Sequence, residues 1–209
     1  MSSTDLDRGS MVRVRIVAIL LAAGEGRRMG APKALLPMRG TSFLAWSAAL
    51  LARPGVSSVV AVLGHEAARV AAECPLPAGA RAVVNEGYRD GMLSSIWRGL
   101  DAAEAAGAEA VLLHLVDHPL VAADTVDRVI EALRAGARIA VPSHAGRRGH
   151  PSGFARSAWP ALRAASKERG ARGVLLDHGD WIVHVAGDPG CLAGIDTPED
   201  YGRLLGPST

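Results

Sequence analysis

A short segment near the start of the chain, residues 21–33, combines three glycines with three cationic side chains. Glycine lets a backbone turn tightly and approach a ligand closely, because no Cβ stands in the way. Bare amide groups together with fixed positive charge suit a polyphosphate. The residues concerned are Gly24, Gly26, Gly30, Arg27, Arg28 and Lys33. This segment therefore predicts a phosphate-binding loop.

The glycine spacing in this loop differs from two common phosphate-binding patterns. Walker A requires Gly-x-x-x-x-Gly-Lys-Ser/Thr, whereas Gly30 is followed by alanine and proline. The dinucleotide fingerprint requires Gly-x-Gly-x-x-Gly and an acid about 20 residues later. Here the last glycine comes one position too late, and residues 38–50 contain no acid. The spacing disfavours a nicotinamide-dependent oxidoreductase, and an ordinary strand-to-helix turn with surface arginines remains the structural alternative.

The lysine that ends this loop adds to the argument. Lys33 and Lys167 are the only lysines in a chain with 23 lysines and arginines together. Where arginine is the usual cation, a lysine indicates a site that needs a compact point charge and not a wide planar guanidinium. Lys33 is therefore expected to neutralise phosphate charge.

Two acids from distant parts of the sequence are candidates for a metal site. Asp117 follows the apolar run 110–116, so it is expected at the carboxyl end of a buried strand, on the same sheet edge as the glycine loop. A carboxylate there reaches phosphates only through a cation, and Mg²⁺ is the expected one. Asp196 precedes a predicted helix at 198–205. The structural alternatives are turn capping before Pro119 and a helix-dipole role for Asp196.

Two further segments are candidates for binding the rest of the substrates. Gly91 allows close approach, and Ser94 and Ser95 supply hydroxyls and amides near a helix start, which is a natural anion site. His150 lies in the basic segment 147–151 and is a candidate contact for an acceptor phosphate. Simple capping by Ser94 and a flexible basic turn at 147–151 are the alternatives.

The elements that must position these residues alternate between strand and helix. Apolar runs predict strands at 14–21, 58–63, 82–84, 110–116, 139–141 and 181–185. Helical patterns predict helices at 43–51, 66–72, 94–106, 125–135, 158–165, 171–176 and 198–205. The alternation predicts one three-layer α/β/α, Rossmann-like domain with a mostly parallel sheet. His114, inside one of these strands, is expected to be a core histidine with satisfied hydrogen bonds.

Length and composition limit the class of protein. The 209 residues suit one domain, expected at 12–206, with residues 1–11 as a disordered leader or cloning remnant. No apolar run reaches the roughly 18 residues that span a membrane, and no signal segment begins the chain, so a cytoplasmic protein is expected. The net charge of +2, without a basic stripe, disfavours nucleic-acid binding. Cys74 and Cys191 are expected to be free thiols.

The loop resembles the signature of a known family. Residues 21–37 read Leu-Ala-Ala-Gly-x-Gly-Arg-Arg-Met-Gly-x-Pro-Lys-x-Leu-Leu-Pro, which is similar to the MobA-like nucleotidyltransferases. The resemblance covers residues 14–205, including an Ile-Asp-Thr-Pro-Glu-Asp motif at 195–200. Its Leu-Ala-Ala-Gly start is similar to the molybdenum cofactor cytidylyltransferases, whereas guanylyltransferases usually have Leu-Ala-Gly-Gly. The implied fold is of the nucleotide-diphospho-sugar transferase type.

This resemblance implies a reaction and a set of roles. A magnesium-dependent enzyme would transfer NMP, CMP from CTP being favoured, to a phosphorylated acceptor such as molybdopterin and release pyrophosphate. The expected catalytic residues are Arg28, Lys33 and Asp117, and the expected metal ligands are Asp117 and Asp196. The expected substrate-binding residues are Leu21, Ala22, Ala23, Gly24, Gly26, Gly91, Ser94, Ser95 and His150. The family has Gly-Asp-x-Pro around Asp117, and this chain departs from it with Val116 and His118.

Three alternatives to cytidylyl transfer stay open at this point. The donor or acceptor could differ, as in guanylyl transfer or transfer to a sugar or polyol phosphate. The protein could also be a non-catalytic nucleotide-binding protein on the same fold, because fold alone does not settle activity. A molybdoenzyme or a chaperone that handles an unstable pterin is the macromolecular partner to consider, and no nucleic-acid or membrane partner is expected.

Overall fold

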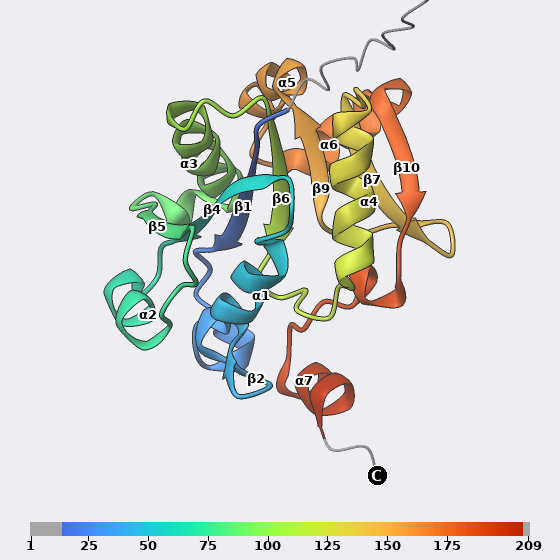
Figure 1. Cartoon of the computed structure of the whole chain (residues 1–209). Coiled ribbons are helices and arrows are strands. Elements are labelled where there is room, and N and C mark those ends of the chain that lie inside the picture. Colours follow the sequence, from blue (N-terminus) through green and yellow to red (C-terminus); the bar gives the residue numbers. More distant parts are fainter. Residues whose placement is uncertain (1–13, 207–209) are drawn as a thin grey trace, which may run out of the picture.

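The computed structural model describes residues 14–206, which form a sheet with helices on both faces (Figure 1). The strands of the main sheet lie in the order β10-β7-β9-β6-β1-β4-β5, and β8 pairs with β7. Their bounds are β1 Ile16–Ala22, β4 Val56–Leu63, β5 Ala80–Val84, β6 Ala110–Leu115, β7 Ile139–His144, β8 Arg147–Arg148, β9 Ser152–Ala155 and β10 Ile182–Ala186. The expected leader at 1–11 lies outside the described residues.

The helices divide between the two faces of this sheet. Their bounds are α1 Phe43–Leu51, α2 Ala67–Glu73, α3 Met92–Ala105, α4 Ala123–Arg134, α5 Trp159–Arg163, α6 Gly170–Asp177 and α7 Pro198–Leu205. Apolar residues of α1, α2 and α4 join one buried cluster, against which α7 packs, and those of α3, α5 and α6 join the other. The predicted three-layer α/β/α architecture with a mostly parallel sheet is confirmed.

The central strand β1 explains why the sheet is covered on both faces. All seven of its residues are buried, and successive side chains point to opposite faces, so each face receives an apolar row. Strand β1 pairs in parallel with β4 and with β6. In that register Leu21 lies opposite Leu115, so the glycine loop after β1 and the Asp117 turn after β6 emerge side by side.

The structure contains strands that the sequence patterns do not predict. Strand β9 runs antiparallel between β6 and β7. Its four residues, Ser-Gly-Phe-Ala, carry one large apolar side chain, Phe154, so neither alternation nor an apolar run marks the segment. Gly153 lets α4 pack closely, because a Cβ there would lie 2.9 Å from side-chain atoms of Val129 and Leu133. The segment expected as a basic loop, 147–151, begins with β8, which forms a hairpin with the end of β7. A second hairpin joins β2, Pro37–Met38, to β3, Thr41–Ser42.

The remaining expectations about elements and thiols agree with the structure. Every predicted helix and strand is present, with ends shifted by a few residues. Cys74 and Cys191 are buried free thiols, as expected. Among the described residues, no helix has both the length and the hydropathy needed to span a bilayer.

Candidate functional site

The glycine loop after β1 folds into two short 3₁₀ turns, Arg27–Met29 and Lys33–Leu35. Gly26 begins the first turn at φ 62° and Gly30 ends it at φ 72°. Both angles lie in the left-handed region that favours glycine. The backbone hydrogen bond from Met29 N to Gly26 O, 2.8 Å, closes this turn. The tight loop directs the Lys33 side chain back toward the end of β6.

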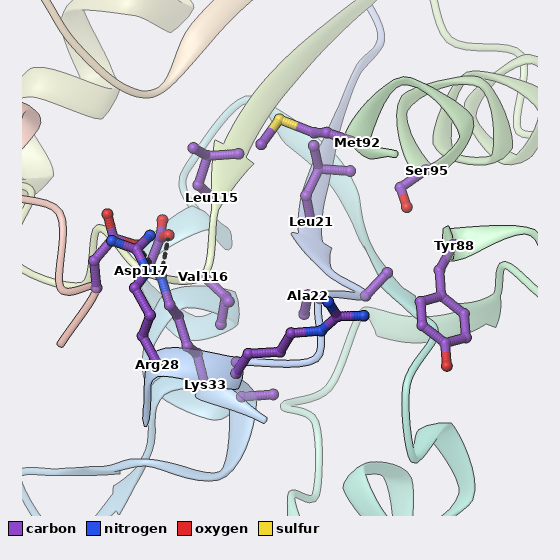
Figure 2. A pocket seen from close by; sticks show the side chains of 16 residues that line it. Leu21, Ala22, Arg28, Lys33, Tyr88, Met92, Ser95, Leu115, Val116 and Asp117 are labelled. Carbon is purple, nitrogen blue, oxygen red and sulfur yellow. Dashed lines mark hydrogen bonds and ion pairs between the residues drawn. The ribbon is translucent and has the colours of Figure 1, made fainter. Parts of the chain in front are cut away.

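The Lys33 ammonium joins the two acids that the sequence proposed as metal ligands. Lys33 Nζ lies 2.7 Å from Asp117 Oδ2 and 2.5 Å from Asp196 Oδ1. A guanidinium nitrogen of Arg28 lies 3.2 Å from the same Asp196 oxygen. Figure 2 shows Lys33 and Arg28 on the Asp117 side of the cavity, with Tyr88 and Ser95 on the opposite side. Four charged groups from three distant segments thus meet at the carboxyl edge of the sheet.

Backbone hydrogen bonds place the two acids beside each other. Ile195 N donates to Asp117 O at 2.9 Å, which holds the segment before α7 against the turn after β6. Asp200 Oδ2 accepts from the backbone N–H groups of Asp196 and Thr197, each at 3.2 Å, in a capping box at the start of α7. Asp200 therefore has a structural role at the start of α7. On the other side, Trp46 Nε1 donates to Pro119 O at 2.8 Å and fixes the end of the turn.

The electrostatics of this cluster favour its charged forms. Burial acts to raise the pKa of Asp117, but hydrogen bonds from His118 and Lys33 outweigh it and hold the pKa well below its ordinary value. Burial likewise acts to lower the pKa of Lys33, and hydrogen bonds to Asp117 and Asp196 more than compensate, so the pKa is raised. The two groups therefore remain an ion pair across the physiological pH range.

A cavity of about 320 Å³ opens beside this ion pair, within the usual size range of small-molecule sites. It brings together most of the predicted residues. From the loop it is lined by Leu21, Ala22, Ala23, Gly24 and Gly26. Its polar and charged lining includes Arg28, Lys33, Ser95, Asp117 and Asp196. Three predicted residues, Gly91, Ser94 and His150, are not among the lining residues of this cavity.

Other lining residues had been given no role by the sequence analysis. Tyr88, Met92, Leu115 and Val116 also line the cavity. Met92 is 59% exposed, and Figure 2 shows it beside Leu21 and Leu115, at an apolar rim. An exposed apolar side chain at a cavity mouth suits the flat face of an organic ligand. The Gly-Met-x-x-Ser stretch at 91–95 resembles a segment that lines the cleft in the family, but which of its side chains form the rim depends on how α3 is rotated.

A buried asparagine holds the serine side of the cavity. Asn85 Nδ2 donates to Ser94 Oγ at 2.9 Å and to Ser95 Oγ at 3.0 Å, and Asn85 Oδ1 accepts from Gly87 N. The single O–H of Ser94 has two backbone acceptors in reach, Gly87 O at 3.0 Å and Gly91 O at 2.8 Å. Ser94 thus fastens the loop to the first turn of α3. Ser95 Oγ accepts from Asn85 and lines the cavity, and within residues 14–206 its O–H has no acceptor, so this group is available to a ligand.

Replacement of Asn85 with alanine is expected to raise the Kd for nucleotide about tenfold, because Ser95 loses the group that orients its hydroxyl. The measurement is nucleotide titration by calorimetry on Asn85→Ala, Ser95→Ala and the double variant. The double variant should lose little more than either single one, since both substitutions remove the same oriented donor. Fully additive losses would contradict this coupling.

Three histidines lie near the Asp117 turn. His118 Nδ1 donates to Asp117 Oδ1 at 2.9 Å, and its ring packs edge-on against His150 with centroids 4.8 Å apart. His114 is buried as expected, but the expectation of satisfied hydrogen bonds is wrong: neither of its ring nitrogens has a partner among the described residues. Burial, followed by the nearby charges of His150 and His118, lowers the pKa of His114 to about 3.

The buried His114 predicts a pH dependence of stability. The folded state keeps His114 neutral, whereas the unfolded state protonates it below about pH 6.5. As the pH is lowered from 6.5 to 3, the free energy of unfolding therefore decreases, by up to about 1.4 kcal/mol per pH unit. His114→Leu removes this contribution. From pH 7 to pH 5 the wild type should lose about 2 kcal/mol more than the variant. Urea unfolding at the two pH values measures the difference, and equal losses would contradict it.

The donor set fits a divalent metal that arrives with a nucleotide. Two carboxylates converge on one point, and Mg²⁺ is commonly held by one or two carboxylates plus phosphate oxygens and water. Within residues 14–206 no group of three or more histidine, cysteine, aspartate or glutamate side chains is placed to hold a metal. Asp117 and Asp196 are therefore suited to act as the protein ligands of a metal ion whose other ligands include phosphate oxygens.

Comparison with known proteins assigns the family. Residues 18–181 match the model of the MobA-like NTP transferase domain. The chain belongs to the MobA-like NTP transferase family. This confirms the sequence resemblance, and the family is named for NTP transfer. The finer assignment to the cytidylyl branch is a separate question.

Individual relatives differ in their named activities. The chain is 37% identical to nicotine blue oxidoreductase of Paenarthrobacter nicotinovorans, covering 91% of this chain and 96% of the relative. It is 33% identical to molybdenum cofactor guanylyltransferase of Rhodobacter capsulatus, covering 91% and 95%. Among solved structures, Rv0371c of Mycobacterium tuberculosis superposes with a TM-score of 0.82 at 31% identity, covering 92% of this chain and 97% of that one.

Proposed function

We propose that this protein transfers a nucleotidyl group from a nucleoside triphosphate to a phosphorylated acceptor of the molybdopterin class and releases pyrophosphate. The observation that carries the proposal is the convergence of Lys33, Asp117 and Asp196 beside the glycine loop. Phosphoryl transfer depends mainly on positioning and on stabilising charge. A cationic loop facing two fixed carboxylates supplies both.

The residues of the chain divide the work between the two ends of the cavity. The loop amides at 23–26 bind the phosphates, while Arg28 and Lys33 neutralise the charge that grows on the leaving pyrophosphate. Ser95 and the apolar rim at Met92 hold the base or ribose end. No covalent enzyme intermediate is needed, because the acceptor phosphate attacks the α-phosphate in line.

Asp117 and Asp196 are the residues that would hold Mg²⁺. When bound, the ion supplies charge neutralisation and orientation at the α-phosphate. Support comes from the two converging carboxylates and from the relative Rv0371c, whose structure has also been determined as a complex with manganese. We also propose that His150 acts on the acceptor side, since its ring packs against His118 beside the site.

Two observations bear on which base the donor nucleotide carries, and they favour different bases. The Leu-Ala-Ala-Gly start of the loop favours CTP by its resemblance to the cytidylyl branch, whereas the relatives named guanylyltransferases favour GTP. Ala23 is the residue that distinguishes this start from Leu-Ala-Gly-Gly, and its methyl group would be the steric basis of a pyrimidine preference. Ala23 lines the cavity but is only 6% exposed, and its methyl group lies close to Gly64, where an added Cβ would be 2.8 Å from it. With so small an exposed fraction, the Ala23 methyl group gives little steric reason to prefer a pyrimidine over a purine.

Pyrophosphate release with molybdopterin as acceptor tests this proposal. CTP, GTP, ATP and UTP are compared with and without Mg²⁺, and nucleotide binding is followed in parallel by thermal shift. One nucleotide should give magnesium-dependent pyrophosphate release and raise the melting temperature. Nucleotide binding without release would favour a non-catalytic nucleotide-binding protein, and release with a sugar or polyol phosphate alone would change the acceptor.

A second candidate is an oxidoreductase that uses the same cavity. It is favoured by the 37% identity to nicotine blue oxidoreductase and disfavoured by the glycine spacing and the missing acid at 38–50. Adding NADH and NADPH to the thermal-shift series separates the two candidates. Stabilisation by a nicotinamide dinucleotide, and by no triphosphate, would replace the nucleotidyl transfer proposal with hydride transfer.

A further inference from the structure

The point between the two carboxylates is filled by a side chain of the protein itself. Lys33 Nζ is within hydrogen-bond distance of both acids, at 2.7 Å from Asp117 and 2.5 Å from Asp196. The Lys33 side chain is only 16% exposed, and that of Asp117 22%. An ammonium in this position uses the same oxygens that a metal would need. The two cations therefore compete for one place.

The charges of the site are already balanced in this arrangement. Two carboxylates, Asp117 and Asp196, face two cations, Lys33 and Arg28. A divalent ion entering alone would place two further positive charges beside the Lys33 ammonium, in a partly buried site where like charges repel strongly. When a metal arrives with a triphosphate, the triphosphate supplies the compensating negative charge. Its phosphates also give Lys33 a new partner.

From this competition we propose that Lys33 is a resident counter-cation that keeps divalent metal out of the nucleotide-free site. Metal and nucleotide then bind together, as Lys33 moves from the carboxylates to the phosphates. The inference rests on the metal role proposed above for Asp117 and Asp196. A lysine suits this exchange, because its compact ammonium sits on a flexible four-carbon stem and can move without a change in the backbone.

Binding of Mn²⁺ alone, followed by electron paramagnetic resonance without nucleotide, tests the inference. The wild type should bind Mn²⁺ weakly, and Lys33→Met and Lys33→Gln should bind it at least about tenfold more tightly, because both carboxylates become available. Lys33→Arg keeps the positive charge and should bind as weakly as the wild type. Adding Asp117→Asn to Lys33→Met should abolish the gain.

The second lysine provides a matched control for net charge. Lys167 lies 3.8 Å from Asp90 and its side chain is 56% exposed, so Lys167→Met removes the same charge away from the site. It should leave Mn²⁺ affinity at the wild-type level. An equal gain in Lys167→Met would overturn the inference, since net charge alone would then explain the effect.

The remaining outcomes separate the inference from the proposed function. If the wild type without nucleotide binds Mn²⁺ as tightly as Lys33→Met, and Asp117→Asn removes that binding, the exclusion role of Lys33 is wrong while the metal role of Asp117 stands. If no variant binds Mn²⁺ even with GTP or CTP present, the metal role and the inference both fail. Thermal melting of each variant checks that it is folded.

Discussion

Replacement of Asp117 with asparagine is expected to lower kcat for nucleotidyl transfer by at least about a hundredfold, the loss typical of removing one fixed group that stabilises transition-state charge. Both carboxylate oxygens of Asp117 are engaged: Oδ2 accepts from Lys33 and Oδ1 accepts from His118. Asparagine keeps the shape but loses the negative charge. It therefore weakens the anchor for Lys33 and removes one proposed metal ligand together.

The fold should survive this substitution, because the backbone of Asp117 is held independently. Its carbonyl oxygen accepts from Ile195 N, and the turn is fixed by Trp46 at Pro119. Steady-state pyrophosphate release, with circular dichroism and melting temperature as checks on folding, measures the effect. Near-normal turnover in a folded Asp117→Asn protein would contradict the catalytic role.

A matched control is an ion pair of similar geometry away from the cavity. Asp127 pairs with Arg53 at 2.5 Å, and neither residue lines the cavity. Asp127→Asn also removes a paired carboxylate, so it reports the cost of losing such a pair for stability alone. It should leave kcat within about twofold of the wild type, since surface pairs contribute little.

The ionisation of Asp117 also gives a direction for the pH dependence of stability. Its pKa is lowered in the folded state, after hydrogen bonds from His118 and Lys33 outweigh burial. Such a group stabilises the folded protein above the pKa that it has when unfolded, about 3.9, and this contribution is lost as pH falls through its folded pKa. The loss of unfolding free energy at acidic pH should therefore be smaller in Asp117→Asn than in the wild type. This difference should arise at a lower pH than the difference caused by His114.

The parts of the site that the sequence could predict are those fixed by a strand end. Apolar runs marked β1 and β6, and a parallel sheet places the residues that follow such strands at one edge. This argument correctly predicted that the glycine loop and Asp117 would meet. The pairing of Asp196 with Asp117 was predicted from the family resemblance, because its physical cause is a backbone contact at Ile195 that no spacing rule reveals.

The parts of the site that could not be predicted depend on how a helix is rotated about its axis and on which hydrogen-bond partners surround a buried side chain. Helix α3 begins at Met92, not at Ser94, and its rotation turns Ser95 toward the cavity while Ser94 bonds to the loop. The orienting role of Asn85 depends on the same packing. His114 looked like an ordinary core histidine, and only the structure shows that neither of its ring nitrogens has a hydrogen-bond partner in the part of the chain that is described.

A large loss of nucleotide binding is expected when Gly26 is substituted. Gly26→Ala should weaken nucleotide binding by at least about a hundredfold, because a Cβ at this position would lie 2.0 Å from the carbonyl oxygen of Ala31. The clashing atom belongs to the backbone, so no side-chain rotation relieves it. The left-handed φ of 62° adds about 1–2 kcal/mol for a residue with a Cβ. The loop must open, and Lys33, two residues beyond Ala31, would lose its position beside the carboxylates.

Gly30 separates the steric effect from the conformational one. It also has a left-handed φ, 72°, but an added Cβ would meet no atom within 4 Å. Gly30→Ala therefore carries the cost of the left-handed conformation without the clash, and its nucleotide affinity should fall by no more than about tenfold. Calorimetric titration of both variants with the preferred nucleotide gives the comparison. Equal losses in the two would mean that glycine flexibility, and not the close approach of Ala31, shapes this loop.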